Sequence, residues 1–368
     1  LQRGSMKERI LHVSCGGLGH GGVSAVIFSI VETLHDQFDF DCVVFKKRCE
    51  KEKLFQKYGK LFRIEAYNDD GKRHIGELLL RPWRMYWGIY KICKTNKYKA
   101  IHCHNNTDEG ICLLAAKCAG VPIRIAHSHN TPSPKKKNVL IKIYEYINRK
   151  LMAYAATDRI GCSEAACCYF FGKEKSKVVF NAVDLNKYRI SERIYHDKLT
   201  FIHVGRYTFQ KNQKMVIQIF QKIIQAIPNS QLLLVGFGED KDKLEKEIHE
   251  LGLEDVVQLV PGNQVDVSEM YAVSDYMIFP SIYEGFGIVL IEAQAMGIPC
   301  FVSEAIQSEA DAGLLTYIRL DAGVDVWAET ILKHIKDGRA IYKSSLEKKL
   351  YQYSNEAIGK QYALIYKG

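Results

Sequence analysis

The segment from Tyr276 to Pro299 places the strongest constraint on the fold of this chain. Tyr276 to Phe279 is a short apolar run that ends at Pro280, which predicts a buried parallel strand. A loop with two glycines follows at 284–287, and residues 288–296 have the pattern of a helix that Gly297 and Pro299 terminate. Because glycine lets backbone N–H groups approach a ligand and a helix N-terminus is electropositive, this arrangement predicts an anion-binding site.

Two carboxylates accompany this predicted site, Glu284 in the loop and Glu292 in the helix. The seven intervening residues, set in Phe-Pro-Ser-x-Tyr-Glu-Gly-Phe-Gly, make the segment resemble retaining GT-B glycosyltransferases of family 4. The resemblance implies that Glu284 contacts hydroxyls of the donor sugar and that Glu292 holds the nucleotide ribose. It also implies that Gly285, Phe286 and Gly287 take part in donor binding.

Length and composition fit a two-domain globular protein. The chain has 368 residues, of which 47% are hydrophobic and 25% charged, enough to bury two cores. No apolar run approaches the ~20 residues that a membrane-spanning helix needs, and Leu1 to Ser5 has the character of a cloning scar. The eleven cysteines lack zinc-finger spacing and predict reduced thiols in a cytoplasmic protein.

Charge is distributed unevenly along the chain. Up to Leu185 there are 31 Lys and Arg against 18 Asp and Glu, whereas the remainder has 20 against 24. Two basic, aromatic-rich helices are predicted at 81–99 and 135–150, and such helices can lie on an anionic membrane surface. Their apolar faces could equally be domain core. No nucleic-acid-binding module is present, and the aromatic residues follow helical rather than strand spacing.

The N-terminal half begins with a strand at 9–14, a glycine-rich loop at 15–23 and a helix at 24–34. This order suits phosphate binding, and the resemblance places Gly21 and Gly22 beside the donor phosphates and the acceptor. A dinucleotide site would need an acidic residue at the end of the second strand, and the segment 41–46 has none there. An NAD-dependent oxidoreductase is therefore disfavoured.

Histidines follow the next two predicted strands, as His102 and His104 and as His127 and His129. Polar residues at the carboxyl ends of parallel strands lie where open α/β sheets bind ligands. The resemblance favours His127 as the histidine beside the transferred sugar, with His129 the alternative, and makes His104, His129 and Asn130 candidates on the acceptor side. Zinc binding by the two His-x-His pairs is disfavoured because no thiol or carboxylate is nearby.

The C-terminal half supplies the cationic candidates. Arg206 and Lys211 flank a turn after the predicted strand 199–204, and the resemblance implies that both neutralise the leaving diphosphate. Gly236 ends the following strand and is a further donor-side candidate. With these cations and a helix N-terminus at the diphosphate, no metal is expected to be needed.

The sequence thus predicts an α/β protein of GT-B type, with two Rossmann-like domains whose parallel sheets face an interdomain cleft. We expect an acceptor-side domain at 6–185, joined by a C-terminal helix at about 354–368, and a donor domain at 186–353. The segment 185–198 is expected to be a linker, and Cys300–Ser303 the last strand. The implied reaction is retaining transfer from a nucleotide diphosphate sugar, UDP rather than GDP by analogy, to a glycan or lipid-linked acceptor at the inner membrane face. A nucleotide-sugar epimerase and a non-catalytic membrane-surface protein remain alternatives.

Overall fold

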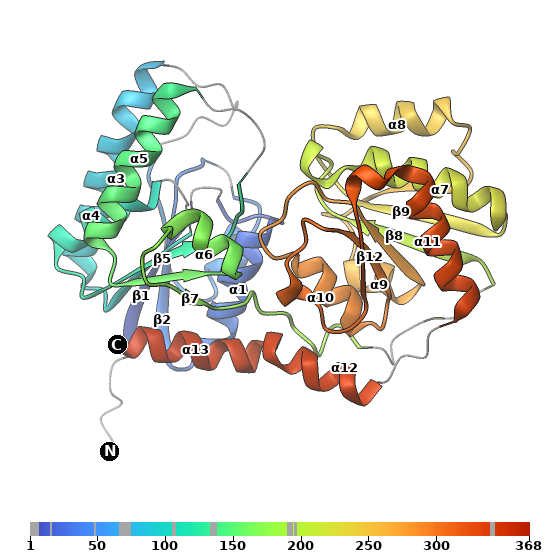
Figure 1. Cartoon of the computed structure of the whole chain (residues 1–368). Coiled ribbons are helices and arrows are strands. Elements are labelled where there is room, and N and C mark those ends of the chain that lie inside the picture. The colour runs from blue at the N-terminus through green and yellow to red at the C-terminus, as the bar shows by residue number, and fades with distance from the viewer. Residues whose placement is uncertain are drawn as a thin grey trace. The chain divides into compact units, whose positions relative to one another are not determined.

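The computed structural model describes residues 7–14, 17–47, 49–65, 75–104, 108–132, 138–189, 194, 197–338 and 343–368, with the side chains of 75–79 and 343–344 excepted. The expected scar at 1–5, the first two residues of the glycine-rich loop, residues 135–137 of the second basic helix and most of 190–196 lie outside the described residues. The chain divides into two compact units, one of residues 1–182 with 355–368 and one of residues 183–354 (Figure 1).

The first unit contains a parallel seven-stranded sheet in the order β3-β2-β1-β4-β5-β6-β7. Its strands are β1 (Glu8–Ser14), β2 (Phe38–Val44), β3 (Leu61–Arg63), β4 (Ala100–Cys103), β5 (Ile123–Ser128), β6 (Asp158–Gly161) and β7 (Lys177–Val178). The chain adds strands outward from β1 in one direction and then returns to add β4 on its other side. This reversal makes a topological switch point between β1 and β4, where open α/β sheets bind ligands at the strand carboxyl ends.

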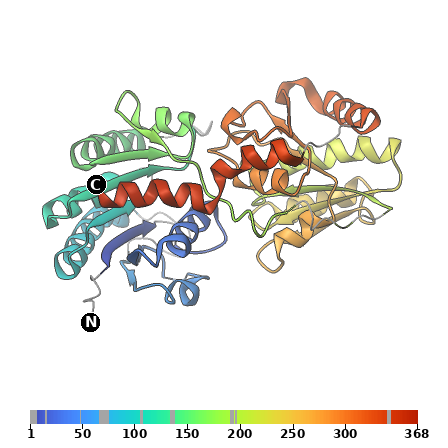
Figure 2. The ribbon, with the colours of Figure 1, turned by 90° about the horizontal axis from the view of Figure 1, so that it is seen from below.

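Helices cover both faces of this sheet. Met85, Leu113, Met152 and Phe170 belong to one buried core, which joins α3 (Ile75–Asn96), α4 (Glu109–Ala119), α5 (Val139–Ala155) and α6 (Glu164–Phe171) to one face. The opposite face receives α1 (Gly22–Leu34) and α13 (Asn355–Lys367), and α13 lies across the strands in Figure 2. A short helix, α2 (Glu52–Phe55), precedes β3.

The second unit repeats this arrangement with a parallel six-stranded sheet in the order β10-β9-β8-β11-β12-β13. Its strands are β8 (Leu199–Val204), β9 (Ser230–Gly236), β10 (Val257–Pro261), β11 (Tyr276–Phe279), β12 (Cys300–Ser303) and β13 (Leu315–Ile318). A shared core packs α7 (Gln213–Ala226), α8 (Lys241–Glu250) and α11 (Gly323–Asp337) on one face. The remaining helices are α9 (Val267–Ala272), α10 (Ile288–Ala295) and α12 (Lys343–Leu350), and the switch point lies between β8 and β11.

Several predicted elements need correction. Cys300–Ser303 is not the last strand, because β13 pairs with it in parallel from Leu315 to Ile318. The described start of the expected linker belongs to the second unit, since the Tyr188 ring packs against that of Tyr271 at 5.9 Å between centroids. In the part of the chain that the structure describes, no helix combines the length and apolar character required to cross a bilayer.

Candidate active site

In the second unit the loops that follow β8 and β11 are joined at the switch point. The Ile282 backbone N–H donates to the Gln210 carbonyl oxygen at 2.9 Å. The Gln210 side-chain amide donates to the Tyr283 carbonyl oxygen at 2.9 Å, and that of Asn212 to the Pro280 carbonyl oxygen at 3.2 Å. These bonds fix the loop that carries Lys211 against the loop that carries Glu284.

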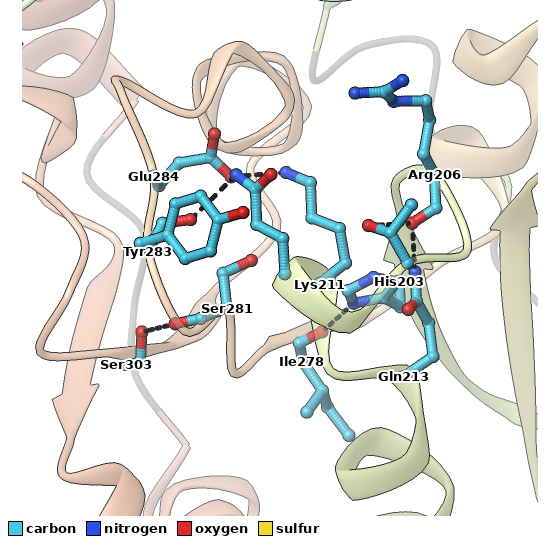
Figure 3. A network of polar contacts seen from close by, with 11 residues as sticks. His203, Arg206, Lys211, Gln213, Ile278, Ser281, Tyr283, Glu284 and Ser303 are labelled. Carbon is cyan, nitrogen blue, oxygen red and sulfur yellow. Dashed lines mark hydrogen bonds and ion pairs between the residues drawn. The ribbon is translucent and has the colours of Figure 1, made fainter. Parts of the chain in front are cut away.

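Lys211 and Glu284 form an ion pair in which the Lys211 ammonium donates to the carboxylate (Figure 3). Their side chains are 16% and 13% exposed, and the Lys211 Nζ atom also lies 4.6 Å from the centre of the Phe279 ring. The lysine is therefore held by a carboxylate and an aromatic face rather than extended into solvent. The structure thus brings two of the candidate site residues into direct contact.

Arg206 lies apart from this pair. Its carbonyl oxygen accepts from the Gln213 side chain at 2.8 Å, which anchors the backbone, while its side chain is exposed. Figure 3 shows the guanidinium standing away from Lys211 and Glu284. In the described part of the chain the guanidinium forms no hydrogen bond or ion pair, so its donors are available to a ligand.

The loop after Glu284 leads directly into α10. Gly287 has φ 86° and ψ 62°, a left-handed conformation that glycine adopts without strain, and it caps the helix N-terminus. The Phe286 side chain is 1% exposed and packs against the Tyr353 ring at 5.8 Å. Phe286 can therefore offer a ligand only its backbone, as can Gly285 and Gly287.

Glu292 lies in α10 beside two tyrosines. The Tyr271 hydroxyl donates to its carboxylate at 3.2 Å, and the Tyr188 hydroxyl also hydrogen-bonds to it. Burial raises the pKa of Glu292 from 4.5 to about 7, although the two tyrosines and Lys187 act in the opposite direction. A carboxylate in this environment gains from any hydroxyl group that donates to its charged form.

The candidate glycines have different surroundings. Gly21 precedes α1, with φ −84°, and a Cβ atom at this position would meet no atom of the described residues within 4 Å. Gly22 begins the helix and is also exposed. A Cβ atom at Gly236 would lie 2.0 Å from the Gly205 carbonyl oxygen, so this glycine is required by the packing of β9 against β8.

In the first unit the predicted histidines meet at the ends of β4 and β5, and His12 of β1 joins them. The His104 Nδ1 atom lies 2.9 Å from His129 Nε2, and His104 Nε2 lies 3.0 Å from His12 Nδ1. His102 Nε2 lies 3.1 Å from His127 Nδ1. Each set of nitrogens, from His12, His102 and His104 and from His104, His127 and His129, falls within 4.8 Å, a donor set that a transition metal can use.

All five imidazoles are neutral in this environment. Burial lowers the pKa of His12 and of His129 to about 3, and it lowers the pKa of His102, His104 and His127 well below 6.5. His127 is fully buried, whereas His129 keeps 9% of its surface exposed and the next residue, Asn130, is exposed. Of the two alternatives at this strand end, His129 is the more exposed.

Sequence reasoning missed the residues that support these candidates. His12, Tyr362 and Tyr366 surround the histidines, Tyr188 and Tyr271 surround Glu292, and His203 lies beneath Lys211 with its Nδ1 atom 2.9 Å from the Ile278 carbonyl oxygen. The alternation His102-x-His104 and His127-x-His129 places each pair on one face of a strand. That periodicity could have revealed the shared cluster.

Two parallel Rossmann-like sheets, one with a glycine loop and histidines and one with the Lys211–Glu284 pair, define a GT-B protein. The glycosyltransferase family 4 model matches residues 20–187, and the model for glycosyl transferases group 1 matches residues 184–316. The two models together span residues 20–316, and the chain is a glycosyltransferase with the GT-B fold.

Relatives agree with this assignment along most of the chain. It is 29% identical over 357 residues to EpsF of Bacillus subtilis (strain 168), whose name assigns it to the glycosyltransferases, with 91% of this chain and 90% of EpsF covered. It is 27% identical over 274 residues to the UDP-Gal:alpha-D-GlcNAc-diphosphoundecaprenol alpha-1,3-galactosyltransferase of Escherichia coli. That match covers 67% of this chain and 70% of the galactosyltransferase. The crystal structure of Anabaena Alr3699/HepE in complex with UDP and glucose has the same fold, with a TM-score of 0.77, 19% identity, and 96% and 98% of the two chains covered.

Proposed function

We propose that this protein transfers a hexose from a UDP-sugar to a hydroxyl of a glycan or lipid-linked acceptor, with retention of configuration, in surface polysaccharide biosynthesis. The observation that carries this proposal is the Lys211–Glu284 pair between the β8 and β11 loops, with the exposed Arg206 on the same β8 loop as Lys211. Cations and a sugar-binding carboxylate are thereby gathered at one strand end. UDP is chosen because the galactosyltransferase relative is named for a UDP-sugar and the HepE structure contains UDP.

In this proposal the diphosphate binds to positive groups of the protein. Arg206 supplies a free guanidinium, Lys211 an ammonium, and α10 the N–H groups of its first turn after Gly287. They stabilise the negative charge that develops on the diphosphate as the glycosidic bond breaks. We propose that this neutralisation makes the reaction independent of a metal ion.

The carboxylates have separate roles in the same proposal. Glu284 accepts hydrogen bonds from donor-sugar hydroxyls while it orients Lys211, and Glu292 accepts from the ribose hydroxyls. In the first unit His127 and His129 orient the sugar as neutral imidazoles, with His104 and Asn130 toward the acceptor. Because burial lowers the pKa of both strand-end histidines, they are unsuited to hold a proton, and the departing diphosphate takes it from the acceptor.

The acceptor is proposed to be reached at a membrane surface. Helices α3 and α5 expose Leu80, Trp83, Trp87, Val139, Leu140, Ile143, Tyr146, Ile147 and Tyr154. Their first halves adjoin, because Arg81 of α3 and Tyr144 of α5 both donate to the Asp108 carboxylate at 2.6 Å. Basic residues of the same helices, among them Lys142 and Lys150, favour anionic lipid.

The test is donor binding followed by product analysis. Thermal shift and calorimetry with UDP, GDP, ADP, NAD and the corresponding sugar nucleotides, in EDTA and in magnesium, should show a stabilising shift for UDP-sugars in both media. Glu284→Gln should keep nucleotide binding but lose most turnover, and Arg206→Ala should weaken nucleotide binding. Proton NMR of the product should show the anomeric configuration of the donor.

Other outcomes would identify the alternatives. Conversion of the UDP-sugar to its epimer without an acceptor would establish an epimerase. A protein that binds vesicles but none of the nucleotides would be a membrane-surface protein without this activity. Binding that requires magnesium would overturn the metal-independent mechanism.

A further inference from the structure

Two rows of hydrogen-bonded imidazoles lie on the face of the first sheet that α13 covers. His12 pairs in register with His102, and His104, His127 and His129 follow at alternate positions, so all five point to the same face. One row runs from His12 through His104 to His129. The other runs from the Tyr366 hydroxyl on α13, 2.8 Å from His102 Nδ1, through His102 Nε2 to His127 Nδ1.

The Tyr366 row can be protonated in two ways. Each neutral imidazole carries one N–H, so each nitrogen–nitrogen bond needs a donor on one side and an acceptor on the other. If Tyr366 donates, His102 carries its proton on Nε2, donates to His127 Nδ1, and leaves an N–H on His127 Nε2. If Tyr366 accepts, both protons reside on Nδ1, and the Tyr366 O–H and the His127 Nε2 lone pair both lack a partner.

Counting partners decides between the two arrangements. Tyr366 is fully buried, and within the described residues its hydroxyl bonds only to His102. His127 Nε2 is buried and has no partner among the described residues in either case. Each arrangement thus leaves one buried donor unpaired within the described residues, and acceptance by Tyr366 leaves the His127 Nε2 lone pair unpaired as well, so donation by Tyr366 is favoured.

We propose that Tyr366 of the C-terminal helix is a positioning residue of the transferase site, which acts through His102 to hold His127 with its proton on Nε2. His127 Nε2, which is buried, then carries a hydrogen-bond donor suited to a sugar or phosphate oxygen that displaces the side chains covering it, and has no lone pair at that atom to act as a base. The link to the reaction rests on the proposed role of His127, whereas the tautomer itself does not. The last helix of the chain thereby controls which hydrogen-bonding form a strand-end histidine offers.

The test uses the full chain labelled with ¹⁵N-histidine, with and without Tyr366→Phe, and long-range ¹H–¹⁵N NMR spectra that distinguish the two tautomers. In the unchanged protein His127 and His102 should each show one tautomer, with the proton on Nε2. Tyr366→Phe removes the hydroxyl donor, so that each of the two arrangements leaves the same number of buried hydrogen-bonding groups unpaired. It should therefore add a substantial Nδ1–H population at both residues.

The chain offers two matched controls. Tyr362 lies one turn earlier on α13 with its ring 5.6 Å from His102 and 6.2 Å from His127, but in the part of the chain that the structure describes its buried hydroxyl has no hydrogen-bond partner. Tyr362→Phe should leave the His102 and His127 tautomers unchanged. In Tyr366→Phe the histidines of the other row, from His12 through His104 to His129, should also keep their ¹H–¹⁵N spectra.

Three results would overturn the proposal. They are a wild-type His127 protonated on Nδ1, an unchanged His127 tautomer in Tyr366→Phe, and an equal change in Tyr362→Phe. A metal ion bound to these histidines would also overturn the proposal, because it would leave His127 Nε2 without a proton. Elemental analysis of the same sample would detect the metal. If the proposed transferase function were wrong but the proposal on Tyr366 correct, UDP-sugar binding would be absent while His102 and His127 both carried their protons on Nε2.

Discussion

At the scale of single residues, two glycines of the candidate site differ in their surroundings: packing requires a glycine at Gly236, whereas Gly21 has room for a side chain. We expect Gly236→Ala to lower the free energy of unfolding by about 1–3 kcal/mol, because its Cβ atom would lie 2.0 Å from the Gly205 carbonyl oxygen. Gly21→Ala should change the free energy of unfolding by less than about 0.5 kcal/mol, since that Cβ atom meets no described residue within 4 Å. If Gly21 faces the substrates, the same change should raise a KM several-fold. Urea unfolding and initial rates measure both effects, and a stable Gly236→Ala protein would contradict the packing argument.

A second prediction at this scale concerns Glu292, whose pKa burial raises to about 7. A ribose that donates to the charged carboxylate favours ionisation, so UDP-sugar affinity should rise between pH 6 and pH 8 by up to about tenfold. The sign for stability is opposite. The folded state holds a proton here that the unfolded state releases above pH 4.5, so this group destabilises the fold as pH rises toward 7.

Calorimetry at the two pH values measures the affinity change. Glu292→Gln is the matched variant, because it keeps the shape of the side chain and cannot ionise. Its affinity should be weaker at pH 8 and nearly independent of pH. A pH dependence that persists in Glu292→Gln would assign the effect to another group.

At the scale of elements, the prediction concerns the apolar surface of α3 and α5. The double variant Trp83→Ala and Trp87→Ala should bind anionic vesicles at least about tenfold more weakly, because each exposed indole contributes apolar area to the interface. Its melting temperature should be unchanged, since these side chains are 64% and 46% exposed. Leu364→Ala is the matched control, as Leu364 is 72% exposed on α13. Two results would contradict the proposed membrane-binding role of this surface. One is binding of the double variant to anionic vesicles as strong as that of the unchanged protein, and the other is equal binding of the unchanged protein to neutral and anionic vesicles.

Elements of this chain could be predicted from local pattern, whereas their neighbours in space could not. Tyr276–Phe279 and Cys300–Ser303 were predicted with their observed bounds, because apolar runs ended by turn residues identify buried strands. The three-residue strand Leu61–Arg63 was missed since so short a segment has no visible period. The Glu284 loop was predicted from its motif, but the Tyr366–His102 bond joins residues 264 apart and has no local trace.

At the scale of the whole molecule, the two units should differ in their resistance to acid. Five buried histidines of the first unit have lowered pKa values, about 3 for His12 and His129. In the unfolded chain they would bind protons below about pH 6.5, whereas the folded state does not. The stability they contribute is fully present above pH 6.5 and is lost as pH falls below it.

The size of this effect decides the outcome. Each such histidine removes about 1.4 kcal/mol per pH unit, so five together remove about 7 kcal/mol per unit, comparable to the whole stability of a domain. In the second unit burial lowers the pKa of His203 to about 4, while Glu292, with its raised pKa, acts in the opposite direction between pH 4.5 and 7. We therefore expect the first unit to unfold about one to two pH units below 6.5, before the second.

Hydrogen exchange is followed by mass spectrometry from pH 7.5 to 4.5 and corrected for the intrinsic pH dependence of exchange. It assigns the loss of protection to one unit or the other. Peptides of β1, β4 and β5 should lose protection first, and those of β8, β9 and β11 at lower pH. His12→Phe removes one titrating group while it keeps an aromatic ring beside Phe40, which lies 5.6 Å away. It should reduce the slope of stability against pH by about 1.4 kcal/mol per unit. Protection of β4 and β5 that persists to pH 4.5 would show that the imidazoles are not held neutral, and simultaneous loss in both units would show that they do not unfold separately.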